Sequence, residues 1–415
     1  MGAQLEQEAA RRGPAMLRAL SHADFRWFWA GALLSNSGTW MQTVAQGWLV
    51  LQLTNSPFWL GFDGFMATLP GLLLTLLGGV FADLVDHKRL LIYGQVGSAL
   101  SALTLAVLLA TGVVNDASDV WVILLLSFVT GCCFAIVGPS FQAITIDLVG
   151  REDLANAIAL NSAQFQFSRV VGPLLAGLAM ERFGIAGCFF INAFSFVAII
   201  GALLHVKIKS APAAGRSIWQ DLLEGFRYVR ERQTIRLLLL LTALSSLFGS
   251  PYLALMPVFA RDVYGWGGRG LSLLMGAAGA GALAGSLLIA YLSDFRRKAL
   301  FVLGTALGAS CCLVGLGLAS RPAFGVAAVF GIGFSFVCSF SVTNTLLQTL
   351  VSDEMRGRVL SMWMFALIGA MPVGSFVAGA AAERLGAPLT VVVCGTVVAA
   401  FVLGVAARGR RLREM

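Results

Sequence analysis

VGPLLAGLAMERFG, residues 171–184, is repeated without a gap as VGSFVAGAAAERLG at residues 373–386. The same offset of 202 residues pairs Gly131 with Gly333 and Phe134 with Phe336, so the register extends back through a whole predicted helix. A match over this length indicates that the chain consists of two related halves.

Composition identifies lipid as the solvent of these halves. Of 415 residues, 58% are hydrophobic and 12% charged, whereas about 25% are charged in a soluble globular protein. The charged residues gather in clusters between apolar stretches long enough to cross a hydrocarbon core of about 30 Å. We therefore predict an all-α membrane protein with twelve transmembrane helices, at residues 26–51, 58–82, 90–112, 120–142, 157–180, 185–206, 236–260, 270–292, 299–319, 324–350, 359–382 and 387–407.

The distribution of basic residues predicts the topology. Of 29 Lys and Arg, 23 fall on one side of the membrane, five on the other, and Arg169 lies inside a span. The positive-inside rule places both termini in the cytoplasm. The net charge of +8 is thus a topology signal, and we expect no nucleic-acid partner.

The repeat and the helix count define a domain organisation. We expect a cytoplasmic tail at 1–25, a six-helix bundle at 26–206, a cytoplasmic linker at 207–235, a second six-helix bundle at 236–407 and a tail at 408–415. Two copies of six helices share one orientation, so a pseudo-twofold axis along the membrane normal relates them and leaves one cavity between them.

The linker carries its own helical pattern. Ser217 and Gln220 have the spacing of a capping box, and an apolar face follows from Ile218 to Val229. Such a helix would lie along the inner membrane surface. A plain linker is the alternative.

Five stretches carry a resemblance to a known family: GTWMQTVAQGWLVLQLTNSPFWLG (38–61), GGVFADLVDHKRLL (78–91), DLLEGFRYVRERQTIRLLLL (221–240), DEMRGRVLSMW (353–363) and PVGSFVAG (372–379). They resemble the major facilitator superfamily, and within it the transmembrane secretion effectors, a branch that includes enterobactin exporters and macrolide efflux proteins. The resemblance implies the major facilitator fold, alternating access and export across a bacterial inner membrane.

The resemblance also implies a cytoplasmic latch. The superfamily's loop between helices 2 and 3 is matched at Gly79, Ala82 and Asp83, while Leu84 replaces the usual Arg. The expected latch comprises Gly79, Asp83, Lys88, Arg89, Asp294, Arg356 and Arg358. The alternative is that Asp83 only solvates a loop.

Glycines of the repeat form an expected helix-packing motif. Gly172, Pro173 and Gly177 are similar to the Gly-Pro motif of superfamily antiporters, and Gly374 and Gly379 are their counterparts in helix 11. Close helix packing with a bend explains the motif equally well.

Two charges inside the membrane are candidates for proton coupling. Arg169 lies near the middle of helix 5 and Asp63 near the outer end of helix 2. A charge near the bilayer centre is unfavourable by about 2.5 to 3.5 kcal/mol and usually faces a cavity or a partner. We predict Asp63 as a protonation site, with Arg169 as its counter-charge or a substrate anchor; a structural pair is the alternative.

Polar residues elsewhere in the spans are candidates for a substrate cavity. Asn36, Trp40, Thr43 and Gln46 share one face of helix 1. The expected lining is Asn36, Trp40, Thr43, Gln46, Gln142, Gln164, Arg169 and Asn344. Polar packing between helices is the alternative for each of these side chains.

These patterns favour transport over catalysis. The chain has no GxxxxGK[ST] nucleotide loop and no His-rich metal motif, so we expect no enzyme activity, cofactor or metal. The predicted function is proton-coupled efflux of a small drug-like or siderophore-like amphipath by a monomer. Uptake or facilitated diffusion of a metabolite or lysolipid, and a non-transporting scaffold or sensor, are the alternatives.

Overall fold

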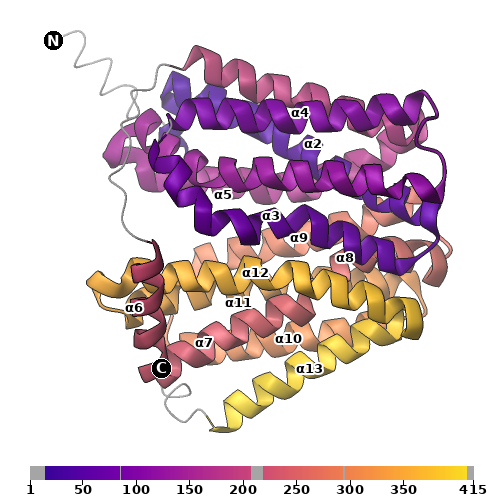
Figure 1. Ribbon diagram of the computed structural model, residues 1–415. Helices are drawn as coiled ribbons and strands as arrows, with labels where there is room; N and C mark the ends of the chain where they lie inside the picture. Colours follow the sequence, from indigo (N-terminus) through magenta and orange to yellow (C-terminus); the bar gives the residue numbers. More distant parts are fainter. Residues whose placement is uncertain (1–14, 85, 207–217, 293–294, 409–415) are drawn as a thin grey trace.

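The computed structural model describes residues 15–84, 86–206, 218–292 and 295–408, with the backbone alone at 15–16, 75–84, 139, 143, 218–223 and 408. Helices dominate this part of the chain (Figure 1). The first half contains η1 (Ala15–Ser21), α2 (Ala23–Thr54), α3 (Pro57–Leu84), α4 (His87–Ala110), η2 (Ala117–Asp119) and α5 (Val120–His205). After α6 (Ile218–Glu231), the second half contains α7 (Gln233–Leu244), η3 (Ser245–Gly249), α8 (Tyr252–Val258), η4 (Phe259–Val263), α9 (Gly268–Leu292), α10 (Lys298–Leu318), α11 (Pro322–Leu350), α12 (Asp353–Leu385) and α13 (Ala387–Arg408).

Two glycines divide the 86 residues of α5 into three spans. Gly150 has φ 71° and Gly184 has φ 69°, a left-handed conformation that glycine adopts without steric strain. The chain reverses direction at both, which leaves helices at 120–149, 151–183 and 185–205. In the second half, α7, η3, α8 and η4 follow one another as a single span, with π-helical turns at η3 and η4.

Counting spans gives the predicted number. Among the described residues, nine helices are long and apolar enough to cross a bilayer. The three segments of α5 raise this number to eleven, and α2, whose 32 residues include many polar side chains, makes twelve. The predicted all-α fold of two six-helix bundles is confirmed.

The fourth and fifth spans are longer than predicted. The sequence predicts helices at 120–142 and 157–180, but helical backbone continues to residue 149 and resumes at residue 151. Ile144 and Leu148 in the added turns are buried with Phe28 and Ala157 in one apolar cluster. The apolar side chains of these added turns are therefore buried against other helices.

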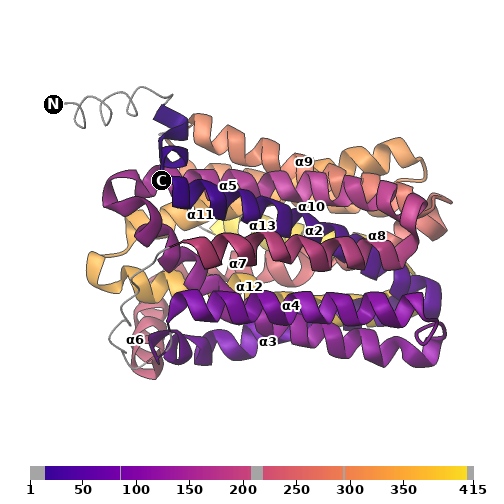
Figure 2. The same cartoon turned by 90° about the horizontal axis from the view of Figure 1, so that it is seen from above.

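The spans run side by side, and α6 lies across them at one end (Figure 1). The helix η1 and the last turns of α13 lie at that same end in both views (Figures 1 and 2). We call it the α6 end, and the other the opposite end. The opposite end holds the connection between α2 and α3 and the beginning of α9.

Glycines of the repeat pack equivalently in the two halves. Gly172 lies against Ser37 and Trp40 of α2, and Gly374 lies against Leu247 of η3. Each thus contacts the first span of its own half. A backbone oxygen lies where a Cβ would need space at both positions, so a larger residue would force the helices apart.

A second pair of glycines joins one half to the other. Gly177 lies against Ser272 of α9, and Gly379 lies against Gly61 of α3. A Cβ at Gly61 would stand 2.6 Å from the Cα of Gly379. The two halves therefore approach within backbone contact near the opposite end.

The helix α6 is attached to the second half. Arg358 of α12 forms an ion pair with Glu224 at 2.5 Å, and Gly225 lies against Met362. Phe226 is 62% exposed on the other face. Residues 207–217, with Ser217 of the predicted capping box, lie outside the described residues, and the domain boundaries remain a prediction.

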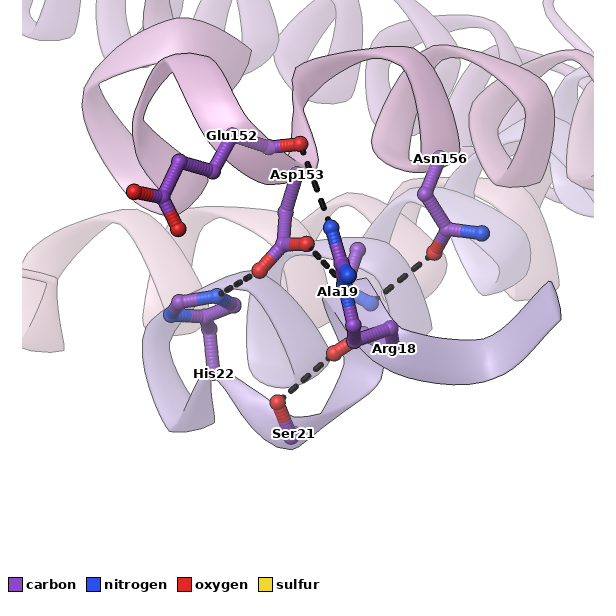
Figure 3. Close-up of polar contacts among 7 residues, drawn as sticks. All are labelled: Arg18, Ala19, Ser21, His22, Glu152, Asp153 and Asn156. Atoms are coloured by element: carbon purple, nitrogen blue, oxygen red, sulfur yellow. Dashed lines mark hydrogen bonds and ion pairs between the residues drawn. The ribbon is translucent and has the colours of Figure 1, made fainter. Parts of the chain in front are cut away.

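The helix η1 is held against the beginning of the fifth span (Figure 3). Arg18 forms an ion pair with Asp153, His22 Nε2 lies 2.8 Å from Asp153 Oδ2, and the Ala19 N–H donates to Asn156 Oδ1 at 2.9 Å. Asp153 precedes the predicted membrane-spanning segment. The hydrogen bond from His22 holds the pKa of Asp153 below its ordinary value, and Arg18 adds to this effect while partial burial opposes it.

Candidate transport site

A cavity of about 340 Å³ lies between the two halves. Its polar lining consists of Thr39, Gln42, Thr43, Gln46, Asp63, Thr68, Ser98, Ser127, Thr130, Asn192, Ser250 and Ser375. Apolar and aromatic side chains such as Trp40, Phe134, Met275 and Met371 complete the wall. A cavity of this size and mixed chemistry suits a small amphipathic ligand.

The helix α2 supplies much of the polar wall. Thr39, Gln42, Thr43 and Gln46 recur at spacings of three and four, so they share one helical face. All four line the cavity. The polarity of α2 that distinguishes it from the other spans is thus concentrated where the two halves meet.

Asp63 is a buried carboxylate in the wall of this cavity. It is 9% exposed and lies six residues into α3, or about 9 Å along its axis. Gln46 Nε2 donates to both carboxylate oxygens at 2.9 Å, and Ser127 Oγ donates to Oδ1 at 2.5 Å. Three spans of the first half therefore meet at one group that can take up or release a proton.

Arg169 lies near the middle of the fifth span and is stacked on Trp40. Its guanidinium carbon lies 5.2 Å from the centre of the Trp40 ring, and Nη1 donates to Gln166 Oε1 at 3.4 Å. Asp63 and Arg169 form no ion pair, and the carboxylate is bound by Gln46 and Ser127.

The remaining predicted cavity residues lie away from the described lining. Asn36 Nδ2 donates to Gln164 Oε1 at 3.3 Å, and Gln164 Nε2 donates to Ser168 Oγ at 3.2 Å. This network joins α2 to α5 by packing. Gln142 is exposed, and Asn344 accepts a hydrogen bond from Gln348 at 2.5 Å.

Several lining residues were not predicted from the sequence. Asn192 is 1% exposed and its Nδ2 donates to Gln42 Oε1 at 2.6 Å. Ser127 bonds to Asp63, while Ser98 and Thr130 line the same wall. These residues belong to no sequence motif. Only the presence of polar residues on two spans that face each other could have indicated them.

An aromatic cluster closes the interface between the halves at the opposite end. Phe376 of α12 packs against Phe58, Phe62 and Phe65 of α3, with ring centres 5.8, 5.8 and 5.6 Å away. Trp59 and Trp121 extend the cluster within the first half. These rings follow α3 past the turn that carries Asp63.

Two glutamates make polar contacts between the halves at the same end. Glu383 accepts a hydrogen bond from Ser56 Oγ at 2.7 Å and one from the Phe58 N–H at 3.3 Å. Glu181 pairs with Arg269 at 3.3 Å. Apolar, backbone and polar contacts thus all join the halves on this side of the cavity.

A sequence model of the family described as transmembrane secretion effector matches residues 15–415. The chain belongs to this family of the major facilitator superfamily. It is a multi-pass membrane transporter.

Relatives within the superfamily align over most of their lengths. The multidrug efflux pump Tap of Mycolicibacterium fortuitum is 27% identical over 372 residues, which cover 86% of this chain and 88% of Tap. The staphyloferrin A transporter of Staphylococcus aureus is 24% identical, covering 89% of this chain and 92% of that protein. The enterobactin exporter EntS of Escherichia coli is 25% identical, with coverages of 89% and 87%.

Solved structures show the same fold. The nucleoside transporter NupG superimposes with a TM-score of 0.75 at 12% identity, covering 93% of this chain and 99% of NupG. A bacterial homologue of the lysosomal transporter Spinster superimposes with a TM-score of 0.67 at 14% identity, covering 94% and 98%.

The predicted latch of this transmembrane secretion effector is described only in part. Asp294 lies outside the described residues, and Gly79 and Asp83 are described by their backbone alone. Lys88 Nζ donates to the Val206 oxygen at 2.7 Å, and Arg89 is exposed at the beginning of α4. Arg356 pairs with Asp353 and Arg358 with Glu224. The latch therefore remains a prediction.

Proposed function

We propose that this transporter exports a small amphipathic molecule in exchange for protons. The observation that carries the proposal is Asp63, a carboxylate held by Gln46 and Ser127 in the wall of a cavity between two pseudo-symmetric halves. A carboxyl group in this position can bind a proton from one side of the membrane and release it to the other when the cavity changes access.

The hydrogen bonds of Asp63 support this role in both protonation states. The Gln46 amide and the Ser127 hydroxyl donate to the charged carboxylate. After protonation, the Ser127 oxygen can accept from the acid and direct its own proton to the Ile123 oxygen, which lies 2.9 Å away. The site can therefore hold a proton without leaving a polar group unpaired.

The contacts between the halves support alternating access. For the cavity to open at the opposite end, Gly61 must separate from Gly379, and the rings around Phe376 must part. The proposed cytoplasmic latch around Gly79 and Asp83 would act at the α6 end in the alternate state.

The direction of transport and the location follow from charge and relatives. Most Lys and Arg of the described residues lie toward the α6 end, so we propose that this end and both termini face the cytoplasm. Tap and EntS are named as efflux and export proteins of bacteria, which supports export across the inner membrane. One chain lines the whole cavity, so a monomer suffices.

Transport by purified protein in vesicles under an imposed pH gradient tests the proposal. The substrate panel contains macrolides, siderophores and lysolipids. We expect gradient-driven flux of a panel member in the wild type and loss of the gradient dependence in Asp63→Asn. Asp262→Asn, which removes an acid at the opposite end, is the matched control and keeps the dependence. Equal flux with and without the gradient favours facilitated diffusion.

A further inference from the structure

Arg169 is a charged group that its surroundings do not neutralise. It lies 19 residues after Gly150 and 15 before Gly184, or about 28 and 22 Å from these two glycines along the helix axis. Among the described side chains, no carboxylate lies within ion-pair distance of it. Its partners are the Trp40 ring and the oxygen of Gln166, both of them neutral.

Five arginines near the ends of the spans do have a carboxylate partner. Ion pairs join Arg18 to Asp153, Arg261 to Asp262, Arg269 to Glu181, Arg356 to Asp353 and Arg358 to Glu224. These residues can also reach water or lipid headgroups, so their charges are easily accommodated. The arginine in the deepest position thus lacks the partner that such a position requires.

Trp40 connects this guanidinium to the cavity. One face of the ring carries Arg169 at 5.2 Å, and the residue itself lines the cavity. Phe165 packs on the ring at 6.2 Å and helps to fix its position. Arg169 itself is not among the described lining residues, so its guanidinium lies next to the cavity on the Trp40 ring.

The rest of the lining fits a ligand with one negative end. Asp63 is the only carboxylate among the described lining residues. Its partner Gln46 follows Trp40 by six residues on α2, about 9 Å along the axis. Between and around them the wall is neutral, with Met275 and Met371 from the second half. An anion at Arg169 would therefore be separated from the charge of Asp63.

We propose that the transported molecule is an organic anion whose carboxylate, or a similar group, binds Arg169 while its apolar body lies against Trp40 in the cavity. This inference rests on the proposed transport function. A planar guanidinium binds such a group through two hydrogen bonds and retains its stack on the indole. The bound ligand supplies the negative charge that Arg169 lacks in the empty cavity.

Equilibrium dialysis of 2-naphthoate and 2-naphthamide against protein in lipid nanodiscs, with empty nanodiscs as the blank, tests the inference. The two probes share one ring system and differ in charge. We expect the wild type to bind naphthoate at least tenfold more tightly than naphthamide. Arg169→Gln should bring the two affinities within about twofold by weakening naphthoate alone, whereas Arg169→Lys should retain part of the preference.

Controls separate charge from folding. Arg321→Gln removes an exposed arginine at the opposite end and should bind both probes as the wild type does. Trp40→Leu keeps the guanidinium and should weaken both probes together. Equal binding of the two probes by the wild type, or an unchanged preference in Arg169→Gln, overturns the inference.

The dialysis result is independent of transport. A preference for naphthoate without gradient-driven flux of any panel member would refute the proposed function and leave an anion site. Gradient-driven flux of neutral amphipaths, together with equal binding of the two probes, would refute the anion site and leave the proposed function.

Discussion

Glu181 and Glu383 occupy equivalent positions of the repeat, and each contacts the beginning of the second span of the other half. Glu181 pairs with Arg269 at the beginning of α9. Glu383 accepts from Ser56 and from the Phe58 N–H at the beginning of α3. Both contacts lie at the opposite end, one on each side of the pseudo-twofold axis, and both must break when the cavity opens there.

The two contacts differ in strength. Glu181 and Arg269 are 52% and 71% exposed at 3.3 Å, and such a surface pair contributes about 0.2 to 1 kcal/mol. Glu383 accepts from one free backbone donor of α3, the Phe58 N–H, and places a negative charge at a helix N-terminus, which contributes about 0.5 to 2 kcal/mol. We predict that Glu383→Ala opens the opposite end about tenfold more often, and Glu181→Ala about twofold.

Distances between spin labels measure this opening. Val113 and Phe324 are exposed at the opposite end in different halves, and cysteines at these positions report the separation in a background without the seven native cysteines. Glu383→Gln keeps the size of the side chain and removes its charge, so it should fall between Glu383→Ala and the wild type. Equal distance distributions in Glu181→Ala and Glu383→Ala would contradict the ranking.

The fold was predictable because lipid imposes it. Without water in the bilayer core, the backbone must satisfy its hydrogen bonds within helices, and the repeat around Gly172 and Gly374 then indicates two bundles. The ends of the two helices that meet at Gly150 were placed less well. Apolar side chains in the turns near Gly150 pack against protein, and hydropathy does not distinguish protein from lipid.

The candidate site was only partly predictable. Trp40, Thr43 and Gln46 form a periodic pattern on one helix, and Asp63 is an acid within a span, so the sequence indicates them. Ser127 is one isolated polar residue in an apolar helix, and its relation to Asp63 depends on how α3 packs against α5. The sequence likewise indicated Arg169 as a counter-charge for Asp63, but not that Gln46 and Ser127 bind the carboxylate.

The contact between Gly61 and Gly379 should not tolerate a methyl group. A Cβ at Gly61 would stand 2.6 Å from the Cα of Gly379, so the backbones of α3 and α12 must separate. We predict that Gly61→Ala shifts the label distances toward the open form at the opposite end and slows transport at least tenfold. Transport assays and the same spin-label pair check this.

Gly304 provides the matched control for Gly61. A Cβ at Gly304 in α10 would meet no atom within 4 Å. Alanine in a helix is favoured over glycine by about 0.5 to 1 kcal/mol, so Gly304→Ala should leave transport unchanged and raise the melting temperature slightly. Wild-type transport in Gly61→Ala would show that the close approach is not required.

Ser127 should affect transport through Asp63. Removal of its hydroxyl takes away a hydrogen-bond donor to the buried carboxylate of Asp63. The loss of such a donor costs about 1 to 3 kcal/mol of folding free energy. We predict that Ser127→Ala lowers gradient-driven flux about tenfold and lowers protein stability by no more than this amount. Combination with Asp63→Asn should add little, because both changes act on the same proton site. Additive losses in the double variant would argue against this coupling.

Attachment of η1 should depend on pH through Asp153. The pKa of Asp153 is held below its ordinary value by His22, with a further contribution from Arg18. An acidic group whose pKa is lowered in the attached state stabilises that state at pH values above its ordinary pKa, which is about 3.9 for Asp. This contribution is lost as the pH falls through the lowered pKa. We predict that attachment is constant from pH 7 to about pH 4 and weakens only below that.

Fluorescence anisotropy of a probe at Leu17→Cys, which is 48% exposed on η1, measures this attachment. Asp153→Asn removes the charge at every pH. We expect it to lower the free energy of η1 attachment by about 1 kcal/mol, which corresponds to about a fivefold rise in the detached fraction of η1 at pH 7. Asp24→Asn changes an exposed acid in the first turn of α2 and should match the wild type. Anisotropy that falls between pH 7 and pH 5 in the wild type would contradict the assignment, because Asp153 remains charged throughout that range.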